Sequence, residues 1–487
     1  MIPAMEKKIN LKPVFSNRVH TAAWEGPCRT GKLEELTEEY ERKLGEEEFA
    51  RWKPLLEKKI DPEYTKILDP VYMEWDETYV VKECELKKVE KDIHETDIFL
   101  FTYRVPGLIE KYHKPMVMMN LGPTPIDLVA YYTDIGEEAY MVHDYEELNM
   151  LLRVLQVKKA ISSTKLLILS GTEHIPVSVN SSIHDLPMLQ EKYGIRNSRV
   201  SFRLVFDEME RVAGKNGKIV ERNTEALIEK SVETNIPAED LAQDLTFYHA
   251  VKSLMNKYEC NAFTIPCMNL CATRIPALKH FVPCITHTLL KDEKYPTSCE
   301  EDISVWMAVM VLMYLSEKSV FMGNPVLVKK GHYEVEEIGI MKGMVSKAKP
   351  EFDEEVLEIH HSVPGMKMNG FENDSLPYKI GHFTHEGWGG KIQIDMNENS
   401  EKKVTFARFN RSADSMFVGR GEIIDIEFRE EFCSPAIFIK TEGNVRELRQ
   451  KLAKGRYGHH LAVVYGDYAD SLRQLGEIMN FNVEVYP

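Results

Sequence analysis

An unbroken apolar segment, residues 303–315, is the feature that most constrains how this chain can fold. Its sequence, ISVWMAVMVLMYL, is apolar around the whole circumference of a helix, which is typical of a helix enclosed by other elements. The segment is too short to span a bilayer. Thr297 or Ser298, just upstream, can cap it, and acids in the first turn suit the positive end of the helix dipole. The sequence therefore predicts a buried helix.

The three acids that precede this helix, Glu300, Glu301 and Asp302, allow two interpretations. The first is a structural helix cap. The second is a metal or acid–base site, because carboxylates at the mouth of a buried helix need a partner and a divalent cation is a common one. We expect a cation within coordination distance of at least one of them, with Glu300 and Asp302 as ligand candidates. All three are candidates for catalytic proton transfer.

Length and composition are those of a globular protein with two or three domains. The chain has 487 residues, of which 43% are hydrophobic and 28% charged. Its net charge of -16, with no long basic block, argues against a nucleic-acid or anionic-membrane surface. The first residues lack the apolar core of a signal peptide, and nowhere do eighteen uncharged apolar residues run together. We therefore expect a cytoplasmic protein that does not enter a membrane.

The eight cysteines are expected to be reduced thiols in such a compartment. Five of them fall between residues 260 and 299, and Cys267 and Cys271 have the spacing of half a zinc site. A matching pair is missing from the sequence, so small buried apolar side chains are the favoured interpretation.

The order of elements predicts an α/β fold with two Rossmann-like parallel-sheet units followed by a β-rich, antiparallel and barrel-like C-terminal domain. The expected boundaries are 1–60 for an N-terminal extension, 61–164 and 165–325 for the α/β domains, and 326–487 for the β-rich domain, with a strand at 331–340. In the extension, the segment from Trp24 to Arg29 fits either a polar ligand rim or a packed terminus. The turn after the strand at 116–121 lacks the glycine spacing of a dinucleotide loop.

Two histidine groups lie in the β-rich region, beside small-residue turns. One contains His361 and the other contains His385. Should the fold bring either to the acids, the result is a carboxylate–histidine site with open positions. Such a site suits Mn²⁺, Mg²⁺ or Fe²⁺ better than structural zinc.

Four short motifs carry a resemblance to a known family: SCEED at 298–302, SVFMGN at 319–324, VTFAR at 404–408 and GHHLAVVYGD at 458–467. Together with the order of the predicted elements, these motifs give residues 100–487 a resemblance to the L-fucose isomerase and L-arabinose isomerase superfamily. The resemblance implies an aldose–ketose isomerase that uses a divalent metal, usually Mn²⁺, held by two acids and a histidine. It places the ligands among the three acids and at His385, with His361 second, and implies a homo-oligomer, a trimer or hexamer.

The chain departs from the family at one point. A further acid is expected after the strand that precedes the buried helix, but the turn from Pro266 to Cys271 has none, and no Asp or Glu stands between Glu259 and Asp292. Either an acid comes from elsewhere, or Glu300 and Asp302 both ligate, or the chemistry has changed.

Three functions are therefore considered. The first is isomerisation of a sugar through an enediolate, in which one of the three acids doubles as the base. The second is another sugar reaction, such as that of an epimerase or lyase. The third is a non-catalytic sugar-binding protein.

Overall fold

A computed structural model describes residues 2–20, 32, 35, 37–76, 81–102, 109–170, 179–328, 352–396, 399–430 and 433–487. The expected ligand rim at Trp24 to Arg29 and the expected strand at 331–340 lie outside these residues. The chain divides into two compact units, one spanning Glu6–Lys159 and the other Ala160–Pro487 with the first residues of the chain.

The unit Glu6–Lys159 is built on a parallel sheet with strand order β2-β1-β4-β5-β6, in which β3 also pairs with β1. The apolar run of β4 is buried along its whole length, as expected for a parallel strand covered on both faces. The strands are β1 (Ile9–Arg18), β2 (Thr65–Ile67), β3 (Val71–Trp75), β4 (Ile98–Phe101), β5 (Met116–Met119) and β6 (Ala139–Val142). The helices are α1 (Glu38–Lys59), α2 (Glu83–Glu90), α3 (Thr124–Asp134) and α4 (Tyr145–Ser162).

Strand β1 lies inside the segment that the sequence analysis assigned to an N-terminal extension. It pairs with three other strands of this sheet. The first sheet therefore begins at β1 rather than near residue 61. The strand contains Lys12 and Pro13, and these interrupt the apolar pattern by which a strand is recognised.

The second unit contains another parallel sheet, with strand order β11-β10-β7-β8. Both parallel sheets were predicted. The strands are β7 (Lys165–Ser170), β8 (Arg196–Ser201), β10 (Ala262–Ile265) and β11 (Thr297–Cys299). Its helices are α5 (Leu186–Tyr193), α6 (Phe202–Lys230), α7 (Ala238–Lys257), α8 (Cys267–Ala272), α9 (Ile275–Lys279), α10 (Cys284–Asp292) and α11 (Ile303–Ser316).

The β-rich region forms a closed barrel, as predicted. Strands follow the order β16-β19-β12-β13-β18-β17, and β17 pairs with β16 to close the ring. Each of these pairings is antiparallel, whereas β20 adds to β17 in parallel. The strands are β12 (Phe321–Val328), β13 (Val356–His360), β16 (Lys403–Phe409), β17 (Ser415–Glu427), β18 (Ala436–Thr441), β19 (Leu461–Tyr465) and β20 (Asn482–Tyr486), with helices α12 (Val445–Lys454) and α13 (Ala469–Met479).

A small third sheet in this unit joins β9 (Glu233–Asn235), β14 (Tyr378–His382) and β15 (Gly390–Ile394) in the order β15-β14-β9. Strand β9 lies between helices of the second α/β region, and β14 and β15 come from the β-rich region. The two predicted domains 165–325 and 326–487 thus share a sheet within one compact unit.

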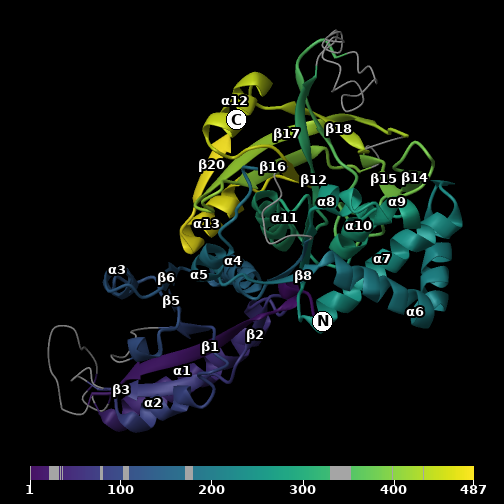
Figure 1. The fold of residues 1–487 in the computed structure, drawn as a ribbon. Coiled ribbons are helices and arrows are strands. Elements are labelled where there is room, and N and C mark those ends of the chain that lie inside the picture. The colour runs from purple at the N-terminus through teal and green to yellow at the C-terminus, as the bar shows by residue number, and fades with distance from the viewer. Residues whose placement is uncertain are drawn as a thin grey trace. The chain divides into compact units, whose positions relative to one another are not determined.

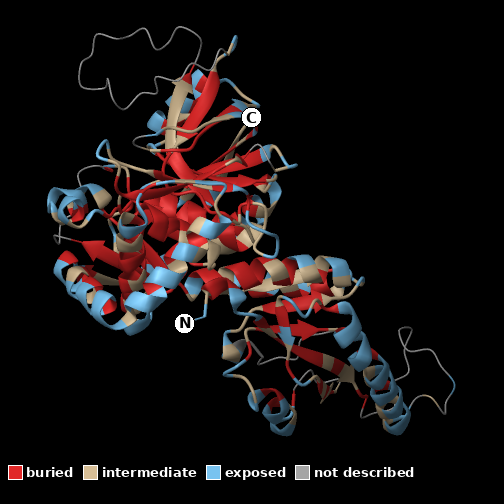
Figure 2. Cartoon of the chain, turned by 90° about the vertical axis from the view of Figure 1, so that its right-hand side faces the viewer, coloured by how far each residue is buried: buried red, intermediate tan, exposed pale blue. Residues whose placement is uncertain are grey.

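Helix α11 is the predicted buried helix, and it lies between the two large sheets of its unit (Figure 1). It packs against β11 of the parallel sheet and against β16 and β19 of the barrel. Its residues from Ile303 to Tyr314 are all buried. Figure 2 shows the same pattern more widely, with buried residues gathered in the strands and on the inner sides of helices. The helix is apolar on all sides because apolar layers cover it from both directions.

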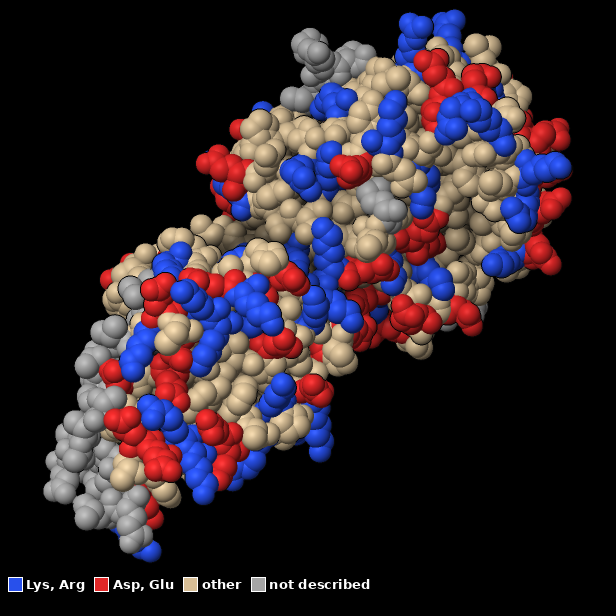
Figure 3. Space-filling view, turned by 90° about the horizontal axis from the view of Figure 1, so that it is seen from below, with Lys and Arg blue, Asp and Glu red and all other residues tan. Residues whose placement is uncertain are grey.

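The charged side chains do not gather by sign on the face drawn in Figure 3, where Lys and Arg are interspersed with Asp and Glu. Among the helices that the structure describes, none has the length and hydropathy required to cross a membrane.

Two adjacent polar residues at the end of α10, the buried Lys291 and the half-buried Asp292, hold two neighbouring segments in place. Lys291 Nζ donates to the carbonyl oxygens of Val320, at 2.9 Å, and Val363. The Asp292 carboxylate accepts from Ser319 Oγ at 2.6 Å and from the backbone N–H groups of residues 366 and 367 at 2.9 and 3.0 Å. Burial raises the pKa of Asp292 to about 6 and lowers that of Lys291 to about 7. The pair thus anchors the segment that follows His361.

Asp292→Ala is expected to lower the free energy of unfolding of this unit by about 2–5 kcal/mol, because it leaves buried donors without an acceptor and Lys291 without its counter-charge. The urea midpoint, followed by tryptophan fluorescence, measures the loss. The matched control is Asp207→Ala, whose side chain is 67% exposed and which should change stability by no more than about 0.5 kcal/mol. Equal stability of the two variants would show that Asp292 anchors nothing.

Candidate metal centre

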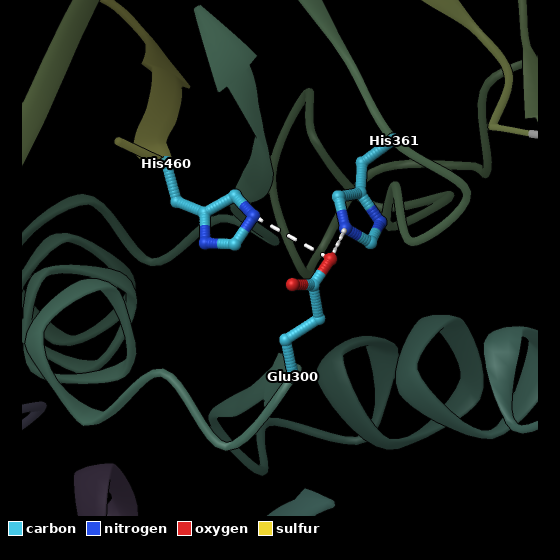
Figure 4. A group of neighbouring side chains, drawn as sticks. All are labelled: Glu300, His361 and His460. Carbon is cyan, nitrogen blue, oxygen red and sulfur yellow. Dashed lines mark hydrogen bonds and ion pairs between the residues drawn. The ribbon is translucent and has the colours of Figure 1, made fainter. Parts of the chain in front are cut away.

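Glu300, His361 and His460 form a group whose potential ligand atoms all lie within 4.8 Å of one another. Glu300 lies between β11 and α11, His361 directly follows β13, and His460 directly precedes β19. Glu300 Oε1 is 3.4 Å from His361 Nε2 and 3.6 Å from His460 Nε2. In Figure 4 the two imidazoles approach the carboxylate from the side opposite to its own backbone. The parallel sheet thus contributes the acid and the barrel contributes the histidines.

The backbone at the centre is held in an uncommon conformation. Glu300, Glu301 and His460 have φ values of 61°, 51° and 66°, in the left-handed region that side chains other than glycine seldom adopt. The Glu301 N–H donates to the carbonyl oxygen of Ile265 at 3.0 Å, which ties the turn to β10. Each such residue costs roughly 1–2 kcal/mol, and strain of this kind concentrates at functional sites. The turn directs Glu300 toward the histidines instead of continuing the strand.

Asp302 supports the site from behind His460. Its Oδ2 lies 2.8 Å from His460 Nδ1 and accepts from Arg408 Nη1 at 2.6 Å. Its Oδ1 accepts from Arg408 Nη2 at 3.1 Å and from the backbone N–H groups of residues 304 and 305, so Asp302 is also the N-cap of α11. With Nδ1–H donated to Asp302, the other ring nitrogen of His460, Nε2, faces Glu300, and a metal ion would take the place of the proton there. A carboxylate behind a histidine is the usual support of a metal ligand.

Arg408 holds Asp302 and His460 together. Besides its two bonds to Asp302, it donates from Nε to the carbonyl oxygen of Tyr457 and from Nη1 to that of His460 at 3.2 Å. Both Arg408 and Asp302 are fully buried. The guanidinium therefore neutralises Asp302 and also positions the backbone from which His460 projects.

The electrostatics of the centre favour an ionised carboxylate beside positive charge. Burial would raise the pKa of Glu300, but the imidazoles of His361 and His460 beside it hold that pKa below its ordinary value. Burial would lower the pKa of His460, but Asp302 and Glu300 outweigh burial and raise it to about 9. Burial also opposes the charge on Asp302, and Arg408 lowers the pKa of that carboxyl.

The donor set fits a divalent cation. His460 Nε2, which faces Glu300, is buried and lacks a hydrogen-bond partner among the residues described. A buried nitrogen without a partner is costly, and coordination of a metal is one way to satisfy it. Two imidazoles and one carboxylate form a set that binds Mn²⁺, Fe²⁺ or Zn²⁺.

The structure brings together some of the predicted site residues and separates others. Glu300 and His361 meet as expected, whereas Asp302 supports a ligand instead of belonging to the group. His385 lies on an exposed loop between β14 and β15, also outside the group. Glu301 faces Arg199, with its Oε1 2.8 Å from Nη2. The structure thus puts His460 where Asp302 and His385 were expected.

His460 was missed as a ligand, although it stands in one of the motifs quoted for the family resemblance. It is 160 residues from Glu300 in the sequence, and the chain offers 16 histidines. The barrel fold brings His460 to the acids, because β19, which begins directly after His460, pairs with β12. The paired histidines at 459 and 460, with a glycine before them, are the one local signal that could have indicated it.

Arg408→Met is expected to destabilise this unit by about 3–5 kcal/mol, because it leaves the Asp302 carboxylate buried without its counter-charge. Thermal and urea denaturation measure the loss. The matched control is Arg420→Met on β17, since Arg420 is 32% exposed and its ion pairs with Glu442 and Asp467 contribute at most about 1 kcal/mol. A loss at Arg408 no greater than at Arg420 would contradict this account of the pair.

Comparison with protein-family models finds no match to this chain, and no curated protein matches it either.

Proposed function

We propose that the chain is a metal-dependent sugar isomerase that interconverts an aldose and a ketose through an enediolate, with Mn²⁺ as its cation. The observation that carries the proposal is the buried group Glu300, His361 and His460, with Asp302 bonded to the outer nitrogen of His460. The resemblance to the L-fucose and L-arabinose isomerases adds the reaction class. It also implies a homo-oligomer, trimeric or hexameric, whose mass light scattering would measure.

The reaction moves a hydrogen between C2 and C1 of the sugar. A divalent cation held by the three residues supplies Lewis-acid stabilisation of negative charge on the sugar oxygens. The protein must then provide a base that removes the proton and returns it to the neighbouring carbon. Such a base works best with a pKa shifted toward neutrality.

Glu301 is the acid that fits the role of base. Its side chain is buried, and Oε2 has no hydrogen-bond partner among the described residues. Burial raises the pKa of Glu301, and the guanidinium of Arg199 limits the rise. Asp302 is unsuitable because both of its oxygens already accept from Arg408. Of the three acids, Glu300 is thus assigned to the metal, Asp302 to support and Glu301 to proton transfer.

The missing acid in the Pro266–Cys271 turn does not count against this assignment. A second histidine, His460, completes a three-residue group without it. The metal therefore needs only one of the three acids, which leaves another free for catalysis. A protein that only binds sugar has no use for such a group, so the geometry favours an enzyme.

Elemental analysis of the purified protein, followed by a ketose assay over a panel of pentoses and hexoses, tests the proposal. We expect about one divalent ion per chain and conversion of at least one aldose, lost with a chelator and restored by Mn²⁺. Bound metal without ketose from any sugar would favour the epimerase or lyase alternative. A protein that binds sugar but no metal would favour the binding-protein alternative.

A further inference from the structure

Two cysteines lie side by side at the carboxyl ends of β10 and β11, next to the metal centre. The strands are parallel neighbours, with Ile265 opposite Cys299. Cys267 is two residues beyond Ile265, where the chain enters α8, and Cys299 directly precedes Glu300. The Cys267 thiol lies beside that of Cys299 and, together with burial, raises the pKa of Cys299.

The path of the chain allows a disulfide. Neighbouring strands are about 4.8 Å apart, and the turn at Pro266 into α8 lets Cys267, two residues beyond the position opposite Cys299, reach the usual Cα separation of about 4.4–6.8 Å. The Glu301 N–H bond to the Ile265 carbonyl, at 3.0 Å, keeps the two chains together beyond the last strand pair. Cys267 is partly exposed and Cys299 is buried, so a small oxidant reaches Cys267 first. Both cysteines are free thiols in the structure.

We propose that Cys267 and Cys299 form a reversible modification site, at which hydrogen peroxide links them in a disulfide and so weakens the metal centre. Formation of the disulfide does not depend on the proposed function, whereas its effect on metal binding rests on that function. Peroxide first oxidises the Cys267 sulfur to a sulfenic acid and is reduced to one water. The Cys299 sulfur then displaces the sulfenic hydroxyl as a second water. Two electrons leave the thiols and reduce one peroxide.

The disulfide affects Glu300 because Cys299 is the residue directly before it. The two neighbouring sulfurs must approach to about 2.05 Å when the bond forms. This movement draws the end of β11 toward α8 and displaces Glu300, which is already held at a φ of 61°. Metal sites tolerate ligand displacements of only about 0.2 Å. We expect oxidation to reduce Mn²⁺ affinity at least tenfold, with recovery on reduction.

Peptide mapping of the full chain tests the link. Reduced, metal-free protein is treated with graded hydrogen peroxide, free thiols are blocked, and linked peptides are identified by mass spectrometry. We expect a Cys267–Cys299 peptide as the main product, removed by dithiothreitol. It should be absent from Cys267→Ser and from Cys267→Ala, a second variant for the case in which serine impairs folding. Cys84→Ser, an exposed cysteine in the other compact unit, is the matched control and should form the link normally.

A main product that joins Cys267 to Cys271 or Cys433, or a Cys267 oxidised only to the sulfinic acid, would overturn the proposed pair. Mn²⁺ titration of reduced and oxidised protein then tests the effect on the metal. Affinity that is unchanged by the disulfide would overturn the link to the metal centre. Reduced protein that binds no divalent ion would overturn the proposed function and that link together, while mass spectrometry decides the disulfide in either case.

Discussion

His460→Ala is expected to abolish stoichiometric Mn²⁺ binding and, with it, all metal-dependent turnover. The variant removes a ligand whose Nε2 is buried without a hydrogen-bond partner in the described chain. Loss of a group that merely supports a ligand typically costs 10–100-fold in metal affinity. Loss of the ligand itself should therefore exceed about 100-fold. Elemental analysis and a Mn²⁺ titration followed by electron paramagnetic resonance measure the effect.

The neighbouring His459 offers a matched control. Its ring lies 4.2 Å from that of His460 but is not part of the ligand group. His459→Ala should keep its metal. Because Asp302 retains Arg408 as its partner in His460→Ala, the fold should survive, and circular dichroism will verify this. Wild-type Mn²⁺ affinity in His460→Ala would show that the group is not a metal centre.

Glu301→Gln is expected to reduce turnover by about 10²–10⁴-fold, the range usual for loss of a general base. Metal content should be unchanged, because Glu301 lies outside the ligand group. The amide oxygen of glutamine still accepts a hydrogen bond from Arg199, so local packing is conserved while the proton acceptor is lost. Turnover and metal content are measured side by side on the same preparation.

Glu300→Gln provides the contrast, since removal of a ligand charge should reduce metal binding and turnover together. Asp302→Asn should lower metal affinity about 10–100-fold through the loss of support for His460. If Glu301→Gln retains full turnover, Glu301 is only the ion-pair partner of Arg199, and the base is another residue.

The buried helix was predictable because its cause is local. A run of apolar residues without a polar face has to be covered, and α11 is covered by two sheets. The helix-cap interpretation of the acids is confirmed for Asp302, the N-cap of α11, and Glu300 belongs to a group that could hold a metal ion. The cap itself was expected at Thr297 or Ser298, but those residues belong to β11.

The pairing of site residues was not predictable, because it depends on contacts between distant segments. Asp302 and Arg408 are 106 residues apart, and Asp302 and His460 are 158 apart. Each of these residues lies in one of the quoted motifs, but the motifs do not indicate which of the residues are in contact. His385 was preferred because of its glycine-rich turn, a local feature that marks a loop equally well.

The position of α11 between the two sheets also determines when the proposed metal site can form. Glu300 comes before α11, His361 after the first strands of the barrel, and His460 only at β19, near the end of the chain. A ribosome-bound chain that lacks β19 has neither the last ligand nor the strand that covers this side of the helix. Under the proposed function, an ion is thus bound only after β19 has been made and has paired with β12 and β16.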